Sequence, residues 1–129
     1  MTQTTTADAT PLLRDWFEIM DSTTPERVLD MITDDFALSI LFSKGADQAA
    51  EFTGDRAGLV VYLEQREVSV LTHHILDGAR VDQTELVLGE TRRDGSFEAS
   101  FNASAQLDAE TGKVRRLLIC RTPQVRFTD

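Results

Sequence analysis

Apolar residues recur at helical spacing near the start of the chain. Thr10-Pro11 offers an N-cap followed by proline at the first helical position, a common helix start. The apolar stripe behind it, at i, i+3, i+4 and i+7, consists of Leu13, Trp16, Phe17 and Met20. Thr24-Pro25 repeats the start signal, and the second apolar face consists of Val28, Leu29 and Ile32. The pattern therefore predicts a helical hairpin.

The apolar pattern then changes from helical spacing to that of strands. A short run rich in β-branched and aromatic residues predicts a strand from about Phe36 to Phe42. A short extended piece around Phe52 precedes Thr53-Gly54-Asp55, which predicts the start of a third helix that runs to about Val68. The polar residues 1–9 predict a disordered tail, and residues 10–129 a single domain.

Everything after residue 70 has the pattern of strands, near 71–81, 84–92, 96–107 and 113–122. Asp94-Gly95 predicts a tight hairpin turn, and Gly112 suits a left-handed residue in the next one. Between Phe97 and Leu107, apolar residues alternate strictly with polar ones. Such a strand has one apolar face, so the helices must cover that face of an antiparallel sheet. The predicted fold class is α+β.

Composition and charge narrow the classes of partner. The chain has 129 residues and a formal net charge of −9, which argues against nucleic acid and anionic membranes, because both attract basic surfaces. Cys120 is the single cysteine, so no intrachain disulfide can form and a reducing compartment is expected. The N-terminus lacks the features of a secretory signal, and no apolar run is long enough to span a membrane. These features predict a cytoplasmic protein.

Four stretches, taken in this order and spacing, resemble the nuclear transport factor 2-like superfamily, which includes ketosteroid isomerases, SnoaL-like polyketide cyclases and many small bacterial proteins. They read PLLRDWFEIMDSTTPERVLDMITDDFALSI, FTGDRAGLVVYLEQR, THHILDGARVDQTELVLGE and FNASAQLDAETGKVRRLLICRTP. The resemblance implies a cone-shaped α+β barrel, in which a curved, mixed-order antiparallel sheet wraps around three N-terminal helices. It also implies a central pocket and a homodimer formed through the sheet face.

The catalytic residues of the ketosteroid isomerases do not carry over to this chain. The resemblance places Ile40 near the position of the isomerase aspartate that takes up a proton. The isomerase oxyanion hole needs a tyrosine on the first helix, where this chain has Trp16 and Phe17. Isomerase chemistry of that particular type is therefore disfavoured.

The only two histidines, His73 and His74, are adjacent on a predicted strand. Neighbouring strand residues point to opposite faces, so at most one of them faces a cavity. His73 would share its face with Asp77, which lies too far along the strand for a hydrogen bond, about 13 Å. A cross-strand carboxylate, Glu85 or Glu90, would be a better partner for a histidine that acts as a general base. The alternative is that both histidines are structural.

Glu90 is the other weak candidate for catalysis. It follows Leu86 and Leu88 at a period of two, so it could continue an inward apolar face, where burial would raise the pKa of its carboxyl group. Alternatively, Glu90 reaches solvent at the strand end or pairs with Arg92 or Arg121.

The expected ligand is a small apolar or weakly polar molecule in the central pocket. Residues expected to line that pocket are Trp16, Leu38, Tyr62, Phe101 and Leu118. No metal, nucleotide or phosphate motif is found, so no cofactor is expected.

Two functions remain open. The first is a SnoaL-like domain that binds a small molecule without turning it over. The alternative is an isomerase, cyclase or hydrolase that uses acid–base chemistry on a small enolisable, polyketide- or steroid-like substrate. A cavity-facing histidine or glutamate within hydrogen-bond reach of a second polar group would favour the enzyme.

Overall fold

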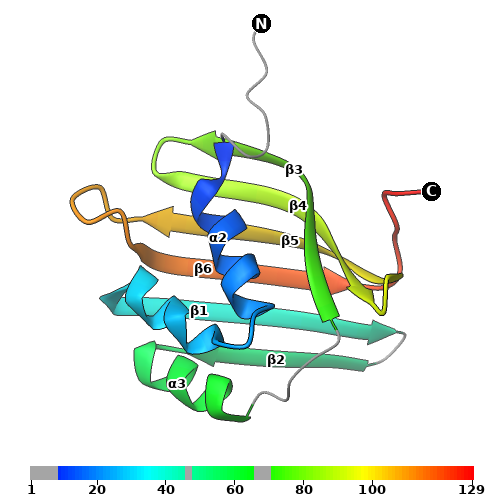
Figure 1. Ribbon diagram of the computed structural model, residues 1–129, viewed down its shortest axis with the longest axis horizontal. Coiled ribbons are helices and arrows are strands. Elements are labelled where there is room, and N and C mark those ends of the chain that lie inside the picture. Colours follow the sequence, from blue (N-terminus) through cyan, green and yellow to red (C-terminus); the bar gives the residue numbers. More distant parts are fainter. Residues whose placement is uncertain (1–8, 46–47, 66–70) are drawn as a thin grey trace, which may run out of the picture.

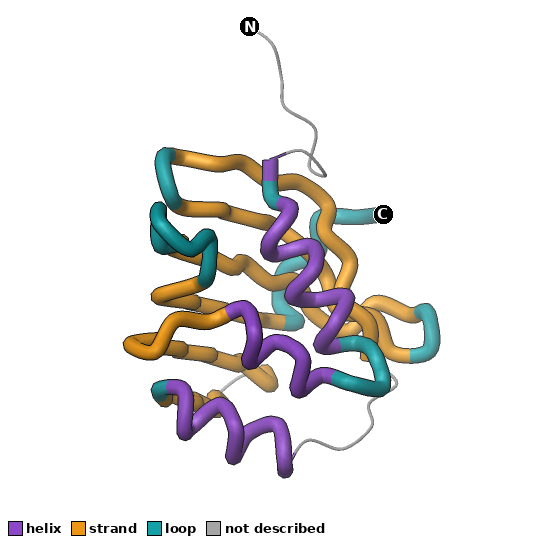
Figure 2. Tube along the Cα trace, turned by 60° about the vertical axis from the view of Figure 1, so that its left-hand side comes forward, coloured by secondary structure: helices purple, strands orange, loops and turns teal. Residues whose placement is uncertain are grey.

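Six strands form one curved, open sheet, and the helices lie on one of its faces (Figures 1 and 2). The computed structural model describes residues 9–45, 48–65 and 71–129. The helical elements are α2 (Pro11–Met20), the 3₁₀ helix η1 (Pro25–Met31) and α3 (Arg56–Gln65). The strands are β1 (Ile32–Gly45), β2 (Gln48–Gly54), β3 (Leu71–Val81), β4 (Thr84–Arg93), β5 (Ser96–Leu107) and β6 (Val114–Thr122). The predicted fold class is confirmed.

The sheet is of mixed order. Its strands follow the order β2-β1-β6-β5-β4-β3, in which β1 and β6 are parallel and every other neighbouring pair is antiparallel. The predicted turn between β4 and β5 is confirmed, with positive φ at both Asp94 and Gly95, as a tight hairpin turn requires. Gly112 also has a positive φ, in the turn before β6.

The core lies between α2 and the apolar face of the sheet. The stripe predicted on α2 is buried as expected: Leu13, Trp16, Phe17 and Met20. On β5 the alternation is confirmed, since Phe101, Ala103 and Ala105 are buried, whereas Asn102 and Gln106 are exposed. The inner face of β5 is therefore apolar, and the polar row of β5 lies on the outer face of the sheet.

The second predicted helix is shorter and tighter than expected. It is the 3₁₀ helix η1, and Ile32 belongs to β1 rather than to its apolar face, with extended backbone angles. β1 thus begins before Asp34-Asp35 instead of at Phe36. Aspartates are depleted in strands, which is why the sequence pattern placed the boundary too late. The pairing of β1 with β6 shifts register between Ile32 and Ala37.

The start predicted for the third helix is confirmed, because the Asp55 side chain accepts a hydrogen bond from the Gly58 N–H at 3.0 Å. The expected end of that helix near Val68, and the expected tail except for its last residue, lie outside the described residues. None of the described helices is long and apolar enough to cross a membrane.

Candidate functional site

A one-residue irregularity in β3 decides which side chains face the helices. Ile75 pairs with Gly89 and Asp77 with Leu88, so Leu76 is an extra residue in β3. Beyond this extra residue, the side chains that would have faced the helices point to the opposite face of the sheet. Asp77 therefore does not share a face with His73 as expected, and its carboxylate accepts a hydrogen bond from the neighbouring Gly78 N–H at 2.8 Å.

His73 points toward the end of α2 and binds Asp21, the C-cap residue of that helix. The Asp21 Oδ1 atom lies 2.7 Å from His73 Nδ1, and Oδ2 accepts the backbone N–H of His73 at 2.6 Å. The two side chains are only 16% and 15% exposed. Both carboxylate oxygens thus contact one residue, which fixes the orientation of Asp21 against β3.

Two aromatic rings hold the imidazole of His73. Phe17 stacks on it, with ring centroids 4.7 Å apart, and Phe101 meets it edge-on at 5.5 Å. Within the described residues, the second nitrogen, Nε2, has no hydrogen-bond partner. Every fully buried polar side-chain atom in that part of the chain does have one, so Nε2 is not fully buried. Nε2 is therefore reached from outside the core.

A cavity of about 500 Å³ opens beside this pair. Its lining residues come from α2 and β3: Arg14, Phe17, Glu18, Asp21, His73, His74 and Ile75. The α2 members recur every three or four residues and so lie on one side of the helix. The cavity combines an apolar wall, Phe17 and Ile75, with two histidines, two carboxylates and an arginine.

The pairing has a direct chemical consequence. A carboxylate accepts the Nδ1–H of a neutral imidazole, which leaves the lone pair on Nε2. The same carboxylate stabilises the imidazolium that forms when Nε2 takes up a proton. This arrangement suits a general base that later returns the proton as an acid.

The sequence pattern did not identify Asp21 as the partner of His73, and the proposed cross-strand partners Glu85 and Glu90 are wrong. One signal was available. An aspartate at the C-terminal end of a helix opposes the negative end of the helix dipole, so its presence there calls for another stabilising contact.

Glu85 faces inward but caps α2 instead of binding a histidine. Its carboxylate is fully buried and accepts the backbone N–H groups of Leu12, at 3.2 Å, and Leu13, at 2.8 Å. Thr10 occupies the N-cap position as predicted, but its side chain makes no capping hydrogen bond.

Glu90 does share a face with Leu86 and Leu88, but that face is the outer one. The C-terminal segment buries its side chain: Thr128 donates to Oε1 at 2.6 Å, and Arg92 pairs with Oε2 at 2.7 Å. The Thr128 hydrogen bond, followed by that of Arg92, lowers the pKa of Glu90. Glu90 is thus an ion-paired structural carboxylate, as the alternative allowed, rather than a cavity acid with a raised pKa.

The His74 side chain lies on the face of β3 opposite that of His73, although His74 also lines the cavity, contrary to the expectation that at most one histidine would do so. Its Nε2 lies 2.7 Å from the Thr72 hydroxyl, on the outer face of β3. Burial, with a further contribution from the positive charge of Arg92, lowers the pKa of His74.

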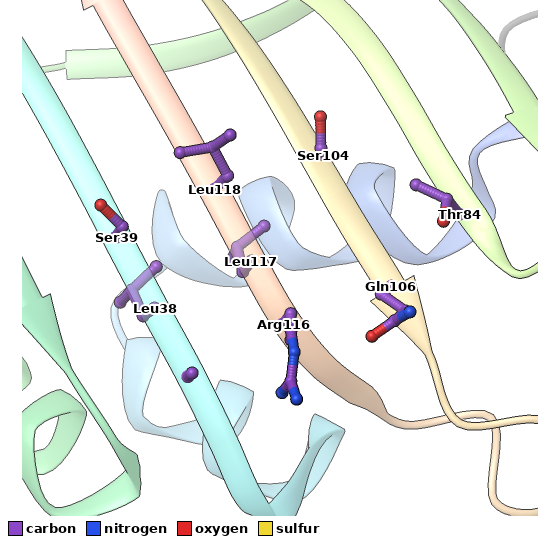
Figure 3. Close-up of a pocket in the computed structure, with 9 residues that line it drawn as sticks. Leu38, Ser39, Thr84, Ser104, Gln106, Arg116, Leu117 and Leu118 are labelled. Atoms are coloured by element: carbon purple, nitrogen blue, oxygen red, sulfur yellow. The ribbon is translucent and has the colours of Figure 1, made fainter.

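The five residues expected to line the pocket do not gather at one place. Phe101 lies against His73, whereas Trp16 packs against Phe36 in the core and Tyr62 against Phe52. Leu38 and Leu118 line a different hollow of about 440 Å³, together with Ser39, Ser104, Gln106 and Arg116 (Figure 3). Leu118 is 48% exposed there, on the outer face of the sheet.

Comparison with protein-family models and with curated protein sequences finds no match. Solved structures match over most of the chain. Nuclear transport factor 2 from Cryptosporidium parvum has a TM-score of 0.63 and 12% identity, covering 88% of this chain and 90% of that one. A protein from Agrobacterium tumefaciens, provisionally named an isomerase of the SnoaL-like family, has a TM-score of 0.64 and 8% identity, with coverages of 88% and 96%.

A third similar structure is a protein of Sinorhizobium meliloti, provisionally named a polyketide cyclase. It has a TM-score of 0.63 and 15% identity, and the match covers 90% of this chain and 99% of that one. At such identities the likeness concerns the fold. The chain accordingly has the fold of the nuclear transport factor 2-like superfamily.

Proposed function

We propose that the protein is an acid–base enzyme that moves a proton on a small enolisable carbonyl compound, with His73 as the catalytic residue. The observation that supports this most is the bond between His73 Nδ1 and Asp21 Oδ1 beside a cavity of about 500 Å³. A histidine that only filled the core would not need a carboxylate at Nδ1 and an accessible Nε2. The provisional names of the S. meliloti and A. tumefaciens proteins agree with this reaction class.

The proposed reaction begins with proton transfer from carbon to nitrogen. The Nε2 lone pair of His73 takes a proton from the carbon next to a carbonyl group, and the electrons of that C–H bond form the enolate. Asp21 stabilises the imidazolium through Nδ1–H. Return of the proton from Nε2 to another carbon completes an isomerisation. Attack of the enolate on a second carbonyl carbon, with protonation of its oxygen by Nε2, completes a cyclisation instead.

The cavity walls assign the remaining roles. Phe17 and Ile75 present apolar surface to the carbon skeleton, which limits the access of water to the enolate. Arg14 lies two turns from Asp21 on the same side of α2 and lines the cavity, so we assign its guanidinium to the substrate oxygen that becomes negative. The substrate is then a mainly apolar ketone or 1,3-dicarbonyl compound of one or two rings.

The test uses proton exchange, which requires no knowledge of the natural substrate. Cyclic ketones and 1,3-diketones are incubated in D₂O with the protein, and loss of the α-proton signal is followed by NMR. We expect enzyme-dependent exchange that falls by about 100-fold or more in His73→Gln, because general base catalysis typically contributes this much.

His74→Gln is the comparison variant. His74 also lines the cavity, but its Nε2 contacts the Thr72 hydroxyl and has no carboxylate partner, so exchange should fall far less than in His73→Gln. Equal rates in His73→Gln and wild type, or no exchange with any compound of the panel, would reject the proposal.

A further inference from the structure

Both ends of α2 are bound to the β3–β4 hairpin through carboxylates. At the N-terminal end, Glu85 of β4 accepts the backbone N–H groups of Leu12 and Leu13. At the C-terminal end, Asp21 binds His73 of β3. Leu12 and Asp21 are nine residues apart, so about 13 Å of helix separates these contacts. The helix is thus attached at two points to the hairpin that carries the histidine.

Glu85 has unusual surroundings for a carboxylate. It is 0% exposed, and no described basic side chain bonds to it. Arg80, its cross-strand neighbour, instead donates to the Asp82 carbonyl and the Gln83 side chain. A buried charge without a cation is costly unless hydrogen bonds stabilise it, and here the donors are the two N–H groups at the positive end of the helix dipole. The position of the Glu85 carboxylate is therefore coupled to that of the helix.

A second contact fixes the N-terminal end of α2 against β3. A Cβ atom added at Gly78 would lie 2.9 Å from Cγ2 of Thr10 and 3.2 Å from the Leu86 carbonyl oxygen. Glycine thus permits the start of the helix to lie directly on the strand. Contact with Gly78 stops α2 from moving closer to the sheet, and Glu85 stops it from moving along its axis.

We propose that Glu85 is a positioning residue for the His73–Asp21 pair, because it fixes where α2 lies along its own axis. A shift equal to the rise of one helical residue, about 1.5 Å, is enough to lengthen a 2.7 Å contact beyond hydrogen-bond distance. The effect of Glu85 on the contact between His73 and Asp21 concerns the structure alone. Its effect on proton transfer rests on the proposed function.

The test observes His73 directly. In ¹⁵N-labelled protein, the Nδ1–H signal and the two ring nitrogen shifts report the hydrogen bond to Asp21 and the tautomer. In Glu85→Gln, which keeps the volume and one acceptor oxygen, we expect the Nδ1–H signal to broaden through faster exchange with water. The population of the Nε2–H tautomer should rise at the same time.

Asp55→Asn is the matched control, since Asp55 is the carboxylate that caps α3. This variant should leave the His73 signals unchanged. Glu85→Asp, which keeps the charge but is one methylene shorter, should change them in the same direction as Glu85→Gln, and it decides the matter if Glu85→Gln does not fold. Wild-type His73 signals in a folded Glu85 variant would overturn the inference, as would an equal change in Asp55→Asn.

The same measurements separate this inference from the proposed function. Altered His73 signals in the Glu85 variants, together with full exchange activity in His73→Gln, would retain the positioning role and reject the enzyme. Unaltered His73 signals, together with loss of activity in His73→Gln, would retain the enzyme and reject the positioning role.

Discussion

Phe101 lies directly over Gly89 of the neighbouring strand. A Cβ atom at position 89 would come within 2.4 Å of Phe101 Cζ and 2.7 Å of the His74 carbonyl oxygen. The missing side chain leaves room for the Phe101 ring, which packs nearly perpendicular to the imidazole of His73. The placement of the candidate catalytic histidine therefore depends on a glycine of β4.

Gly89→Ala should lower the free energy of unfolding by about 1–3 kcal/mol, because the added methyl group overpacks a filled region. It should also move the Phe101 ring and change the ring-proton shifts of His73. Urea unfolding and NMR measure the two effects. Gly58→Ala is the control, because a Cβ atom there would lie 3.7 Å from Asp55 Oδ1, an ordinary contact. This substitution should stabilise helix α3 by up to about 1 kcal/mol. A Gly89→Ala protein with unchanged stability and His73 shifts would contradict the prediction.

Asp21→Asn tests the partner of His73. The amide can donate to Nδ1, which places the proton of a neutral imidazole on Nε2 and removes the basic lone pair from the cavity. We expect proton exchange with the ketone panel to fall by about 100-fold or more, with the protein still folded. Asp15→Asn, which removes the exposed partner of Arg14, should keep most of the activity. Undiminished exchange in Asp21→Asn would show that the pairing has no catalytic role.

His74 should make the stability depend on pH. Burial, and then the charge of Arg92, lowers the pKa of His74 in the folded protein below its usual value of about 6.5. The unfolded chain therefore binds this proton first as the pH falls. The free energy of unfolding is therefore highest above about pH 6.5 and falls as the unfolded chain takes up the proton. It stops falling below the pKa that His74 has in the folded protein.

Urea unfolding of wild type and His74→Gln between about pH 7.5 and pH 5 measures this effect. The wild-type protein should lose more stability over this range than the variant. Parallel curves would contradict the assignment, and an NMR titration of His74 would then locate its pKa directly.

The outer face of the sheet is where we expect a second copy of the chain to bind. Exposed leucines lie on this face in β1, β4 and β6: Leu41, Leu86 and Leu118. Leu118 is flanked there by Ser39 and Ser104, its uncharged cross-strand partners. Interface centres are depleted of charge in this way.

Leu118→Glu should convert a dimer into a monomer in light scattering at micromolar concentration. The control is Val61→Glu, which adds the same charge at an equally exposed apolar residue on α3. A monomeric wild-type protein, or a dimer that tolerates Leu118→Glu, would exclude this interface.

Much of the fold could be predicted because local patterns agreed with one another. The stripe on α2 and the alternation along β5 each reflect burial of one face, which repeats at every second, third or fourth position. The Asp94-Gly95 turn instead reflects residues that accept a positive φ. The strand start at Ile32 was missed because its pairing with β6 lies more than 80 residues away in the sequence. Local composition contains no signal for such a contact.

The candidate site could be predicted only in part. The pattern identified His73 and the opposite directions of the two histidines, which follow from strand geometry. It placed Asp77 on the wrong face, because the extra residue Leu76 changes the phase of β3. It also placed Glu90 on the inner face, because a sequence pattern does not distinguish exposed leucines from buried ones. The partnership with Asp21 depends on the packing of a helix against a strand 52 residues away.

The way α2 is attached has a consequence for how such a protein diverges. Glu85 and Gly78 hold the start of the helix independently of the bond between Asp21 and His73. A lineage that lost Asp21 would therefore keep the helix, the sheet and the cavity while losing the basic nitrogen. Under the proposed function, a catalyst and an inert ligand carrier on this scaffold would then differ by a single codon change, with a folded protein on both sides of it.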